Sequence, residues 1–236
     1  MQIVKPWVEI KKFDGVQLMK NLELAAKQCY RTTSNITDES YKNFLRSCIN
    51  RGHESVIEHE KVSIRMCCDI GVYKDLTRHR HASFSIESTR YCNYSKDRFG
   101  NELKFIEPMF YVSDWTNKNY EGTAMSENEQ KSEIWYYCME DIEERYLQMT
   151  SIGCTTDELR MILPHSTAAE LYMTANMREW RHIFSLRAQK EAHPAVQQVM
   201  IPLLLYFKEQ MPELFDVIPY NEKFDVNKYA EIKIIE

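Results

Sequence analysis

The sequence has 236 residues, of which 44% are hydrophobic and 28% charged, proportions typical of a soluble globular protein. A chain of this length suits one domain with a sizeable core, so we expect residues 1–236 to form a single domain. Its 35 acidic and 30 basic side chains give a net charge of −5, which disfavours a broad nucleic-acid-binding surface. No apolar run approaches the roughly 20 residues of a membrane helix, and we expect neither a membrane span nor a secretory signal.

Hydrophobic periodicity predicts strands and helices in a mixed order. The first predicted elements are a strand over 2–10, a helix over 18–30 capped by Asp14, a helix opening at 37–39 and ending at Gly52, a strand over 61–68 and a helix from 69 to about 80. Residues 93–126 carry turn residues and predict a loop with one strand near 103–108.

The second half of the chain is predicted to be mainly helical. Its predicted elements are a helix over 126–150, a short helix over 157–164, a strand over 166–177, and helices over 178–190 and 195–210. In the helix over 126–150, apolar side chains that include Ile134, Tyr137 and Tyr146 share one side. The whole order predicts an α/β (α+β mixed) fold, a single domain with a central sheet and several long helices.

The cysteines and histidines predict neither disulfides nor a metal site. The seven cysteines include no C-x-x-C pair, which favours reduced thiols and a cytoplasmic location. In HESVIEH, His53 and His59 stand six residues apart, which on a helix places them about 120° from each other. Zinc peptidases need two histidines at i and i+4 on one face, so we expect no metal.

The stretch RHRHASFSIESTRY, residues 78–91, concentrates arginines and hydroxyl side chains. Arginine matches phosphate oxygens bidentately, so a helix end followed by an irregular run with hydroxyls is able to surround a phosphate group. No glycine-rich phosphate loop is present, and Ser88 lacks the G-x-S-x-G elbow of a nucleophile. A solvated polar loop with incidental arginines is the alternative interpretation.

A second cationic feature lies in NMREWRHIFSLRAQ, residues 176–189. Trp180, Ile183 and Phe184 share one helical face, and Arg187 falls on that same face. An arginine in an apolar stripe is costly to desolvate unless something pairs with it. The partner is either a structural salt bridge or a ligand carbonyl or anion, and Arg160 is a possible further cation for such a ligand.

At these residues the sequence resembles the flavin-dependent thymidylate synthases. Their signature is R-H-R, seven intervening residues, then serine, with arginine two positions later; residues 78–80, Ser88 and Arg90 match it. GHES at 52–55 is similar to the family's G-H-[ED]-[ST] segment, and LRMILP at 159–164 is similar to its A-R-x-x-L-P. Residues 174–194 resemble the arginine-containing helix that follows in the family.

The resemblance implies a homotetramer of α/β subunits with shared active sites, which binds FAD and methylates dUMP to dTMP. The carbon comes from 5,10-methylenetetrahydrofolate and the hydride from reduced flavin, with NADPH as the co-substrate that reduces the flavin. By position, the residues implied to contact FAD are Ser55, Arg78, His79, Arg80, Asn176, Arg178 and His182. Those implied to contact dUMP are Ser85, Glu87, Ser88, Thr89, Arg90, Arg160 and Arg187. Arg187 is also the implied catalytic residue, because it stabilises negative charge developing on the uracil ring.

The sequence departs from the family pattern at Ile86 and Asp75, and His193 matches only one version of the histidine that relatives place after the helix arginine. Ile86 stands where relatives carry a polar side chain, and our hypothesis is that Glu87 substitutes for it. Asp75 stands where a glutamine often reaches dUMP, and we expect its carboxylate to turn toward Arg78 or His79 at i+3 and i+4 on the helix.

Two functions from other classes remain as alternatives. A non-catalytic nucleotide or RNA-binding module is favoured by the local arginines but opposed by the net charge of −5. A metal-dependent nucleotide hydrolase would use His53, His59 and His79.

Overall fold

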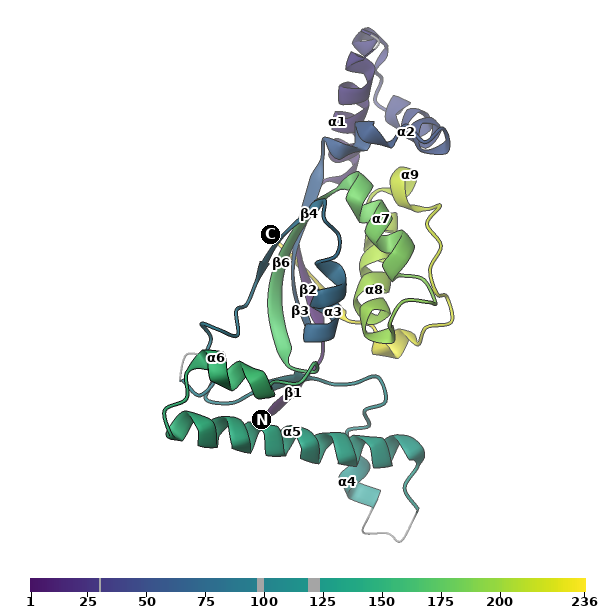
Figure 1. Ribbon diagram of the computed structural model, residues 1–236. Coiled ribbons are helices and arrows are strands. Elements are labelled where there is room, and N and C mark those ends of the chain that lie inside the picture. Colours follow the sequence, from purple (N-terminus) through teal and green to yellow (C-terminus); the bar gives the residue numbers. More distant parts are fainter. Residues whose placement is uncertain (30, 97–99, 119–123) are drawn as a thin grey trace. The chain divides into compact units, whose positions relative to one another are not determined.

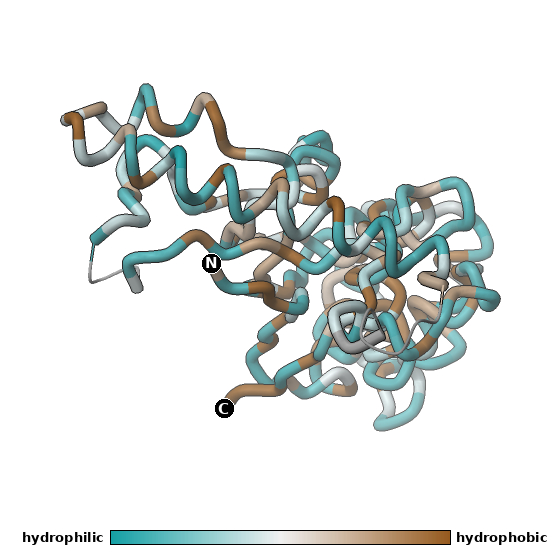
Figure 2. Tube along the Cα trace, turned by 90° about the horizontal axis from the view of Figure 1, so that it is seen from below, coloured by the Kyte–Doolittle hydropathy of each residue, from teal (hydrophilic) through white to brown (hydrophobic). Residues whose placement is uncertain are grey.

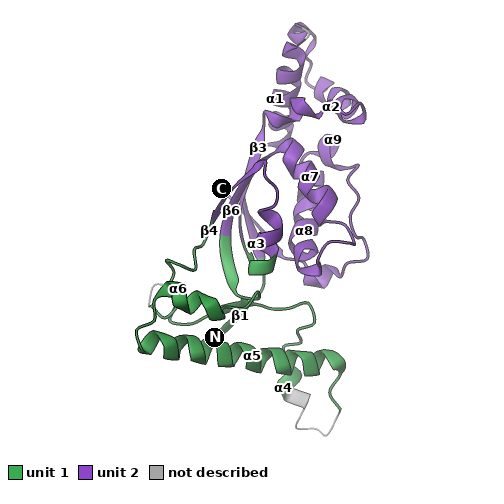
Figure 3. Ribbon diagram, viewed as in Figure 1, with its two compact units in different colours: residues 1–6, 67–71, 86–170 green, residues 7–66, 72–85, 171–236 purple. Residues whose placement is uncertain are grey.

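The computed structural model describes residues 1–29, 31–96, 100–118 and 124–236. These residues divide into two compact units, drawn in separate colours in Figure 3. Unit 1 comprises Met1–Pro6, Cys67–Gly71 and Ile86–Glu170, and unit 2 comprises Trp7–Met66, Val72–Ser85 and Leu171–Glu236. Whether residues 1–236 act as the one predicted domain stays a prediction.

Most residues of a five-stranded sheet belong to unit 2. Its strands, in spatial order, are β4 (Ala82–Ile86), β6 (Ala168–Asn176), β3 (Lys61–Asp69), β2 (Trp7–Lys11) and β7 (Glu231–Ile235). β2 and β7 pair in parallel with Val8 opposite Ile232. Val62, Ile64 and Met66 of β3 are buried, as the alternation over 61–68 predicts.

The helices of unit 2 pack on this sheet and on one another. They are α1 (Gly15–Gln28), α2 (Ser40–Asn50), α3 (Ile70–Leu76), α7 (Met177–Arg187), α8 (Pro194–Gln210) and α9 (Pro212–Phe215), with short 3-10 turns at η1 (Thr33–Asn35), η2 (Glu54–Glu58) and η5 (Val226–Lys228). Figure 1 shows α7 and α8 side by side along one face of the sheet. Between them, Trp180 stacks on Phe184 at 5.4 Å, and Phe207 and Phe215 complete a buried aromatic cluster.

Unit 1 has its own small core around a long helix. Its elements are β1 (Gln2–Val4), β5 (Lys104–Ile106), α4 (Trp115–Lys118), α5 (Glu127–Ser151), α6 (Thr156–Leu159) and η4 (Arg160–Ile162). β1 and β5 pair in parallel. Ser126 and Glu129 form a reciprocal capping box that begins α5. Phe105, Met139 and Tyr146 are central to the buried cluster beneath this helix.

Most of the predicted elements are present, and the differences have local causes. The strand predicted over 2–10 is divided into β1 and β2 by residues 5–6, where Pro6 has no N–H to donate. The prediction of an irregular run after Arg80 is wrong for residues 82–86, because they form β4, which pairs with β6. Tyr30, at the predicted helix end, and residues 97–99 and 119–123, in the predicted loop, lie outside the described residues.

Two further differences concern apolar residues. The predicted apolar side of α5 is only partly buried, since Tyr146 is inside while Ile134 and Tyr137 are 66% and 54% exposed. β7 is not among the predicted elements, and Figure 2 shows its apolar residues as the brown end of the chain at the C-terminus.

None of the helices in the described ranges is both long and apolar enough to cross a membrane.

Candidate active site

Helix α7 carries the polar side chains of the site because its opposite side is anchored in the core. Asn176 caps the helix by accepting a hydrogen bond from the Glu179 backbone N–H at 2.8 Å. The Trp180 indole is buried and donates to the Val62 carbonyl at 3.1 Å. With this face fixed on strand β3, the polar residues on the other side are Arg178, Arg181, His182 and Ser185.

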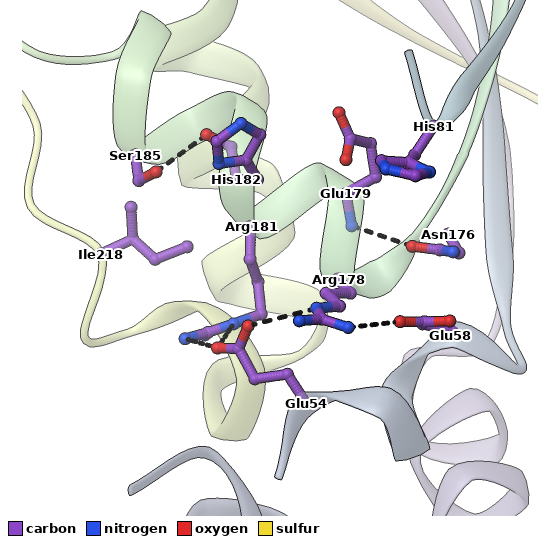
Figure 4. A pocket seen from close by; sticks show the side chains of 10 residues that line it. All are labelled: Glu54, Glu58, His81, Asn176, Arg178, Glu179, Arg181, His182, Ser185 and Ile218. Carbon is purple, nitrogen blue, oxygen red and sulfur yellow. Dashed lines mark hydrogen bonds and ion pairs between the residues drawn. The ribbon is translucent and has the colours of Figure 1, made fainter. Parts of the chain in front are cut away.

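These polar side chains border a cavity of about 610 Å³. This volume is within the usual range of small-molecule binding sites. Figure 4 shows the residues that α7 and η2 contribute to it. The lining residues are Glu54, Glu58, His81, Asn176, Arg178, Glu179, Arg181, His182, Ser185 and Ile218. Three residues implied by the family resemblance to contact flavin, Asn176, Arg178 and His182, therefore lie around one cavity.

Two arginines in the cavity are paired with two glutamates of η2. Arg178 Nη1 donates to Glu58 at 2.6 Å, and Arg181 Nη2 donates to Glu54 at 3.2 Å, as drawn in Figure 4. Arg181 is also fixed by donating to the Leu214 carbonyl, and burial lowers its pKa. The Arg178 side chain is 51% exposed, so its ion pair is weakly held and available for exchange with a ligand anion.

Arg187 lies at the last turn of α7 and is paired within the protein. Its Nε donates to His79 Nε2 at 3.1 Å and its Nη2 donates to the Asp75 carbonyl at 2.8 Å. Its Nη1 also lies 3.8 Å from the Asp75 carboxylate. Of the two alternatives for Arg187, the structural salt bridge is therefore present, and its side chain keeps 19% exposure for a further partner. The Asp75 carboxylate pairs with Arg187, and its charge also acts on His79, one of the two partners predicted for it.

The residues of the R-H-R segment, 78–80, differ in burial. His79 is buried, whereas Arg78 and Arg80 are exposed. Burial is the main cause that lowers the pKa of His79 to about 4, and the nearby Arg187 and His182 act in the same direction while Asp75 opposes them. The ring is thus neutral at physiological pH, as its acceptance of the Arg187 hydrogen bond requires.

His79, Glu179 and His182 stand close enough to suggest a metal site, with their ligand atoms within 4.8 Å of one another. A metal on His79 Nδ1 would leave the ring proton on Nε2, where it would face the Arg187 N–H at 3.1 Å. The guanidinium charge next to this ring also opposes a cation. The proton arrangement therefore disfavours a metal at this group.

A second group of cationic side chains lies in unit 1, at Arg90, the last residue of the family signature. Arg90 Nε donates to Asp157 at 2.8 Å, and its backbone N–H donates to Ser88 Oγ at 3.3 Å. The hydrogen bond from Arg90 is the main cause that lowers the pKa of Asp157, and the charge of Arg160 adds to it. Arg90 and Arg160 thus act on one exposed carboxylate, and Ser88 and Thr89 are half-buried residues that precede Arg90 in the chain.

In the middle of the signature, residues 85–87, the side chain of Glu87 bonds to the protein backbone. Ile86 is half-buried at the end of β4, and the Glu87 carboxylate accepts the Glu170 backbone N–H at 3.2 Å. Burial, with the nearby charge of Glu87, raises the pKa of Tyr94. Glu87 therefore has protein partners, and its substitution for a polar side chain at Ile86 stays a hypothesis. Ser85 is exposed on β4.

Ser55, the remaining predicted flavin residue, borders a different cavity of about 800 Å³ between α1, α2 and η2. Arg51 and His53 also line it, so the GHES segment contributes Ser55 to this cavity and Glu54 to the cavity beside α7. Sequence reasoning missed Glu54, Glu58 and Glu179. The sequence signal for Glu179 is its position three residues after Asn176. This spacing is typical of the first turn of a helix.

Comparison with known proteins gives both a family and a fold. The family model described as "Thymidylate synthase complementing protein" matches residues 16–213. A flavin-dependent thymidylate synthase of Thermosipho melanesiensis is 28% identical over 205 residues, which cover 83% of this chain and 84% of the relative. A probable flavin-dependent thymidylate synthase of Mycobacterium phage L5 is 24% identical over 209 residues, covering 88% and 82%.

Among solved structures, the UMP/dUMP methylase PolB from Streptomyces cacaoi, bound with 5-Br dUMP, is similar with a TM-score of 0.72 at 20% identity. The match covers 92% of this chain and 96% of that protein. At this level of identity the likeness shows the fold, and it confirms the predicted mixed α/β fold class.

Proposed function

We propose that this chain, which belongs to the thymidylate synthase complementing protein family, is a flavin-dependent thymidylate synthase that methylates dUMP to dTMP. Family membership confirms the resemblance that the motifs predict, and the chain is accordingly a methyltransferase. The observation that carries the proposal for the site is the convergence of Asn176, Arg178 and His182 on one cavity of about 610 Å³.

The donors around this cavity fit FAD. A guanidinium, an amide and an imidazole are groups that hydrogen-bond to the pyrophosphate and to the polar edge of a flavin ring. Glu54 and Glu58 pair with the two arginines, and the pyrophosphate would compete with Glu58 for the exposed Arg178 guanidinium. When bound, FAD supplies the hydride, 5,10-methylenetetrahydrofolate supplies the carbon and NADPH supplies the reducing equivalents.

The protein's own residues then bind and orient the substrates. Ser88, Arg90 and Arg160 would hold the dUMP phosphate, which competes with Asp157 for the Arg90 guanidinium. Arg187 would donate a hydrogen bond to the uracil ring and stabilise negative charge there, while the Asp75 carbonyl and His79 keep its guanidinium oriented. No protein nucleophile is required by this division of roles.

The assembly and location belong to the same proposal. The family resemblance supports a homotetramer with shared active sites, and the cysteine pattern supports a cytoplasmic location. The alternative of an RNA-binding module is favoured by the local arginines and opposed by the net charge of −5.

The proposal is tested by dTMP synthesis. Purified protein supplied with FAD, dUMP, 5,10-methylenetetrahydrofolate and NADPH should form dTMP, measured by chromatography, and omission of either the folate or the reductant should stop it. Arg187→Ala should abolish methylation and retain flavin. A complete mixture that forms no dTMP would contradict the proposal, and full turnover by Arg187→Ala would contradict the role of Arg187.

A further inference from the structure

Three side chains in unit 2 form a continuous line of polar contacts that ends at Arg187. Glu179 Oε1 lies 3.3 Å from His79 Nδ1, and His79 Nε2 accepts a hydrogen bond from Arg187 Nε at 3.1 Å. Glu179 and Arg187 belong to α7, whereas His79 comes from the segment between α3 and β4. A histidine from another segment therefore connects the two ends of one helix.

The protons on His79 are determined by its two neighbours. An arginine Nε always carries a proton, so His79 Nε2 has to be unprotonated to accept its hydrogen bond. In the neutral ring the proton then lies on Nδ1, which faces the Glu179 carboxylate. An ionised carboxylate only accepts hydrogen bonds, so Glu179 stabilises this tautomer and no other.

The role of Glu179 is not explained by its position in the helix. Its backbone N–H bonds to the capping Asn176, whereas its side chain lies beside His79 and its charge also acts on Arg178. The residue is only 6% exposed, and a buried carboxylate is costly unless a donor pairs with it. Within the described ranges, the other polar groups near His79 are the His182 ring, with centroids 5.5 Å apart, and the charged Asp75, and neither has a hydrogen bond to Nδ1.

We propose that Glu179 is a positioning residue that holds His79 as the Nδ1–H tautomer and thereby fixes the orientation of the Arg187 guanidinium. Without Glu179, a proton on Nε2 would place two N–H groups against each other at 3.1 Å, and the guanidinium would turn away. The hydrogen bond to the Asp75 carbonyl would be lost with that rotation. The consequence for turnover rests on the proposed function, but the tautomer itself does not.

The tautomer is measured directly by NMR. In ligand-free protein with ¹⁵N-labelled histidine, long-range ¹H–¹⁵N spectra distinguish a protonated Nδ1 from a protonated Nε2, and His79→Gln identifies the signals of this ring. Wild type should show His79 neutral with the proton on Nδ1 at neutral pH. Glu179→Gln keeps an acceptor oxygen and should retain this tautomer, whereas Glu179→Leu should shift the proton toward Nε2.

Turnover should follow the tautomer. Glu179→Leu should lower kcat about 10²-fold, the cost of a misplacement of about 1 Å at a reacting group, while the KM for NADPH changes little. Glu179→Gln should recover most of the rate. Glu140→Leu, at an exposed position of α5, is the matched control and should leave both the spectrum and the rate unchanged.

Two outcomes would overturn the inference. One is a wild-type His79 that is protonated on Nε2 or is cationic at neutral pH, a result that needs no variant and so survives any folding defect. The other is a Glu179→Leu variant that keeps the Nδ1–H tautomer. If instead the spectra behave as expected and wild type forms no dTMP, the proposed function fails while the positioning of Arg187 by Glu179 stands.

Discussion

Replacing Arg187 with lysine keeps the positive charge but removes the planar fork of donors. In wild type, Arg187 Nε bonds to His79 at 3.1 Å and Nη2 bonds to the Asp75 carbonyl at 2.8 Å, in two different directions. A lysine ammonium is a single point at the end of a flexible stem, so it is able to remake one of these bonds and not both. The substitution therefore tests geometry with the charge held constant.

The expected magnitudes follow from these contacts. A hydrogen bond from a charged donor contributes about 1.5–3 kcal/mol to stability, and the 19% exposure of the Arg187 side chain places the loss of one such bond toward the lower end. For a chain of this size, each kcal/mol lowers Tm by about 2–4 °C, so we expect a decrease of roughly 3–8 °C. Loss of one oriented donor to developing charge lowers kcat by about 10²–10³.

The assay combines thermal unfolding with single-turnover formation of dTMP on flavin-loaded protein. Arg145→Lys, on the exposed side of α5, is the control for an arginine-to-lysine change at the surface and should alter neither quantity. An Arg187→Lys enzyme that turns over within threefold of wild type would refute the reasoning, because the directions of the two hydrogen bonds would then be irrelevant to catalysis.

Three other predictions test the fold, the pH response and the nucleotide site. Gly15→Ala should lower the free energy of unfolding by about 1–3 kcal/mol, because its new Cβ would stand 2.1 Å from the Gln210 carbonyl oxygen; an unchanged urea midpoint would contradict this. The pKa of folded His79, about 4, is below its ordinary value of 6.5, so the unfolded chain binds more protons between these pH values and stability is lost as pH falls from about 6.5 to about 4. Urea titrations across that range should show a shallower loss in His79→Asn, and equal slopes would argue against a buried neutral ring. Ser88→Ala should raise the Kd for dUMP by about fivefold with little change in kcat, measured by titration and steady-state rates; loss of turnover with intact binding would instead identify a nucleophile.

The elements that were predictable from sequence are those whose pattern and local signals agree. Helix α7 follows from the spacing of Trp180, Ile183 and Phe184, and its first residue is marked by the capping Asn176. The strand β4 was missed although ASFSI alternates apolar and hydroxyl residues, because the run is short and follows a cationic segment, and its pairing with β6 is a long-range property. The exposure of Ile134 shows that an apolar position does not determine what covers it.

The site was predictable in its residue types and not in its pairings. The position of Arg187 on an apolar face correctly indicated that it needs a partner. The partner could not be found from spacing, since Asp75 and Arg187 are 112 residues apart in the chain. Likewise, the contact of Glu179 with His79 depends on α7 packing beside the segment that follows α3, which only tertiary structure provides.

The visible absorption spectrum of the purified protein, before and after addition of dUMP, tests the central claim most directly. It reports on the flavin and on the nucleotide in one measurement, because a ring bound near the isoalloxazine changes its absorption. We predict a yellow protein with a flavin band that shifts when dUMP is added and does not shift with an equal concentration of dCMP. A protein that remains colourless after incubation with FAD would contradict the account.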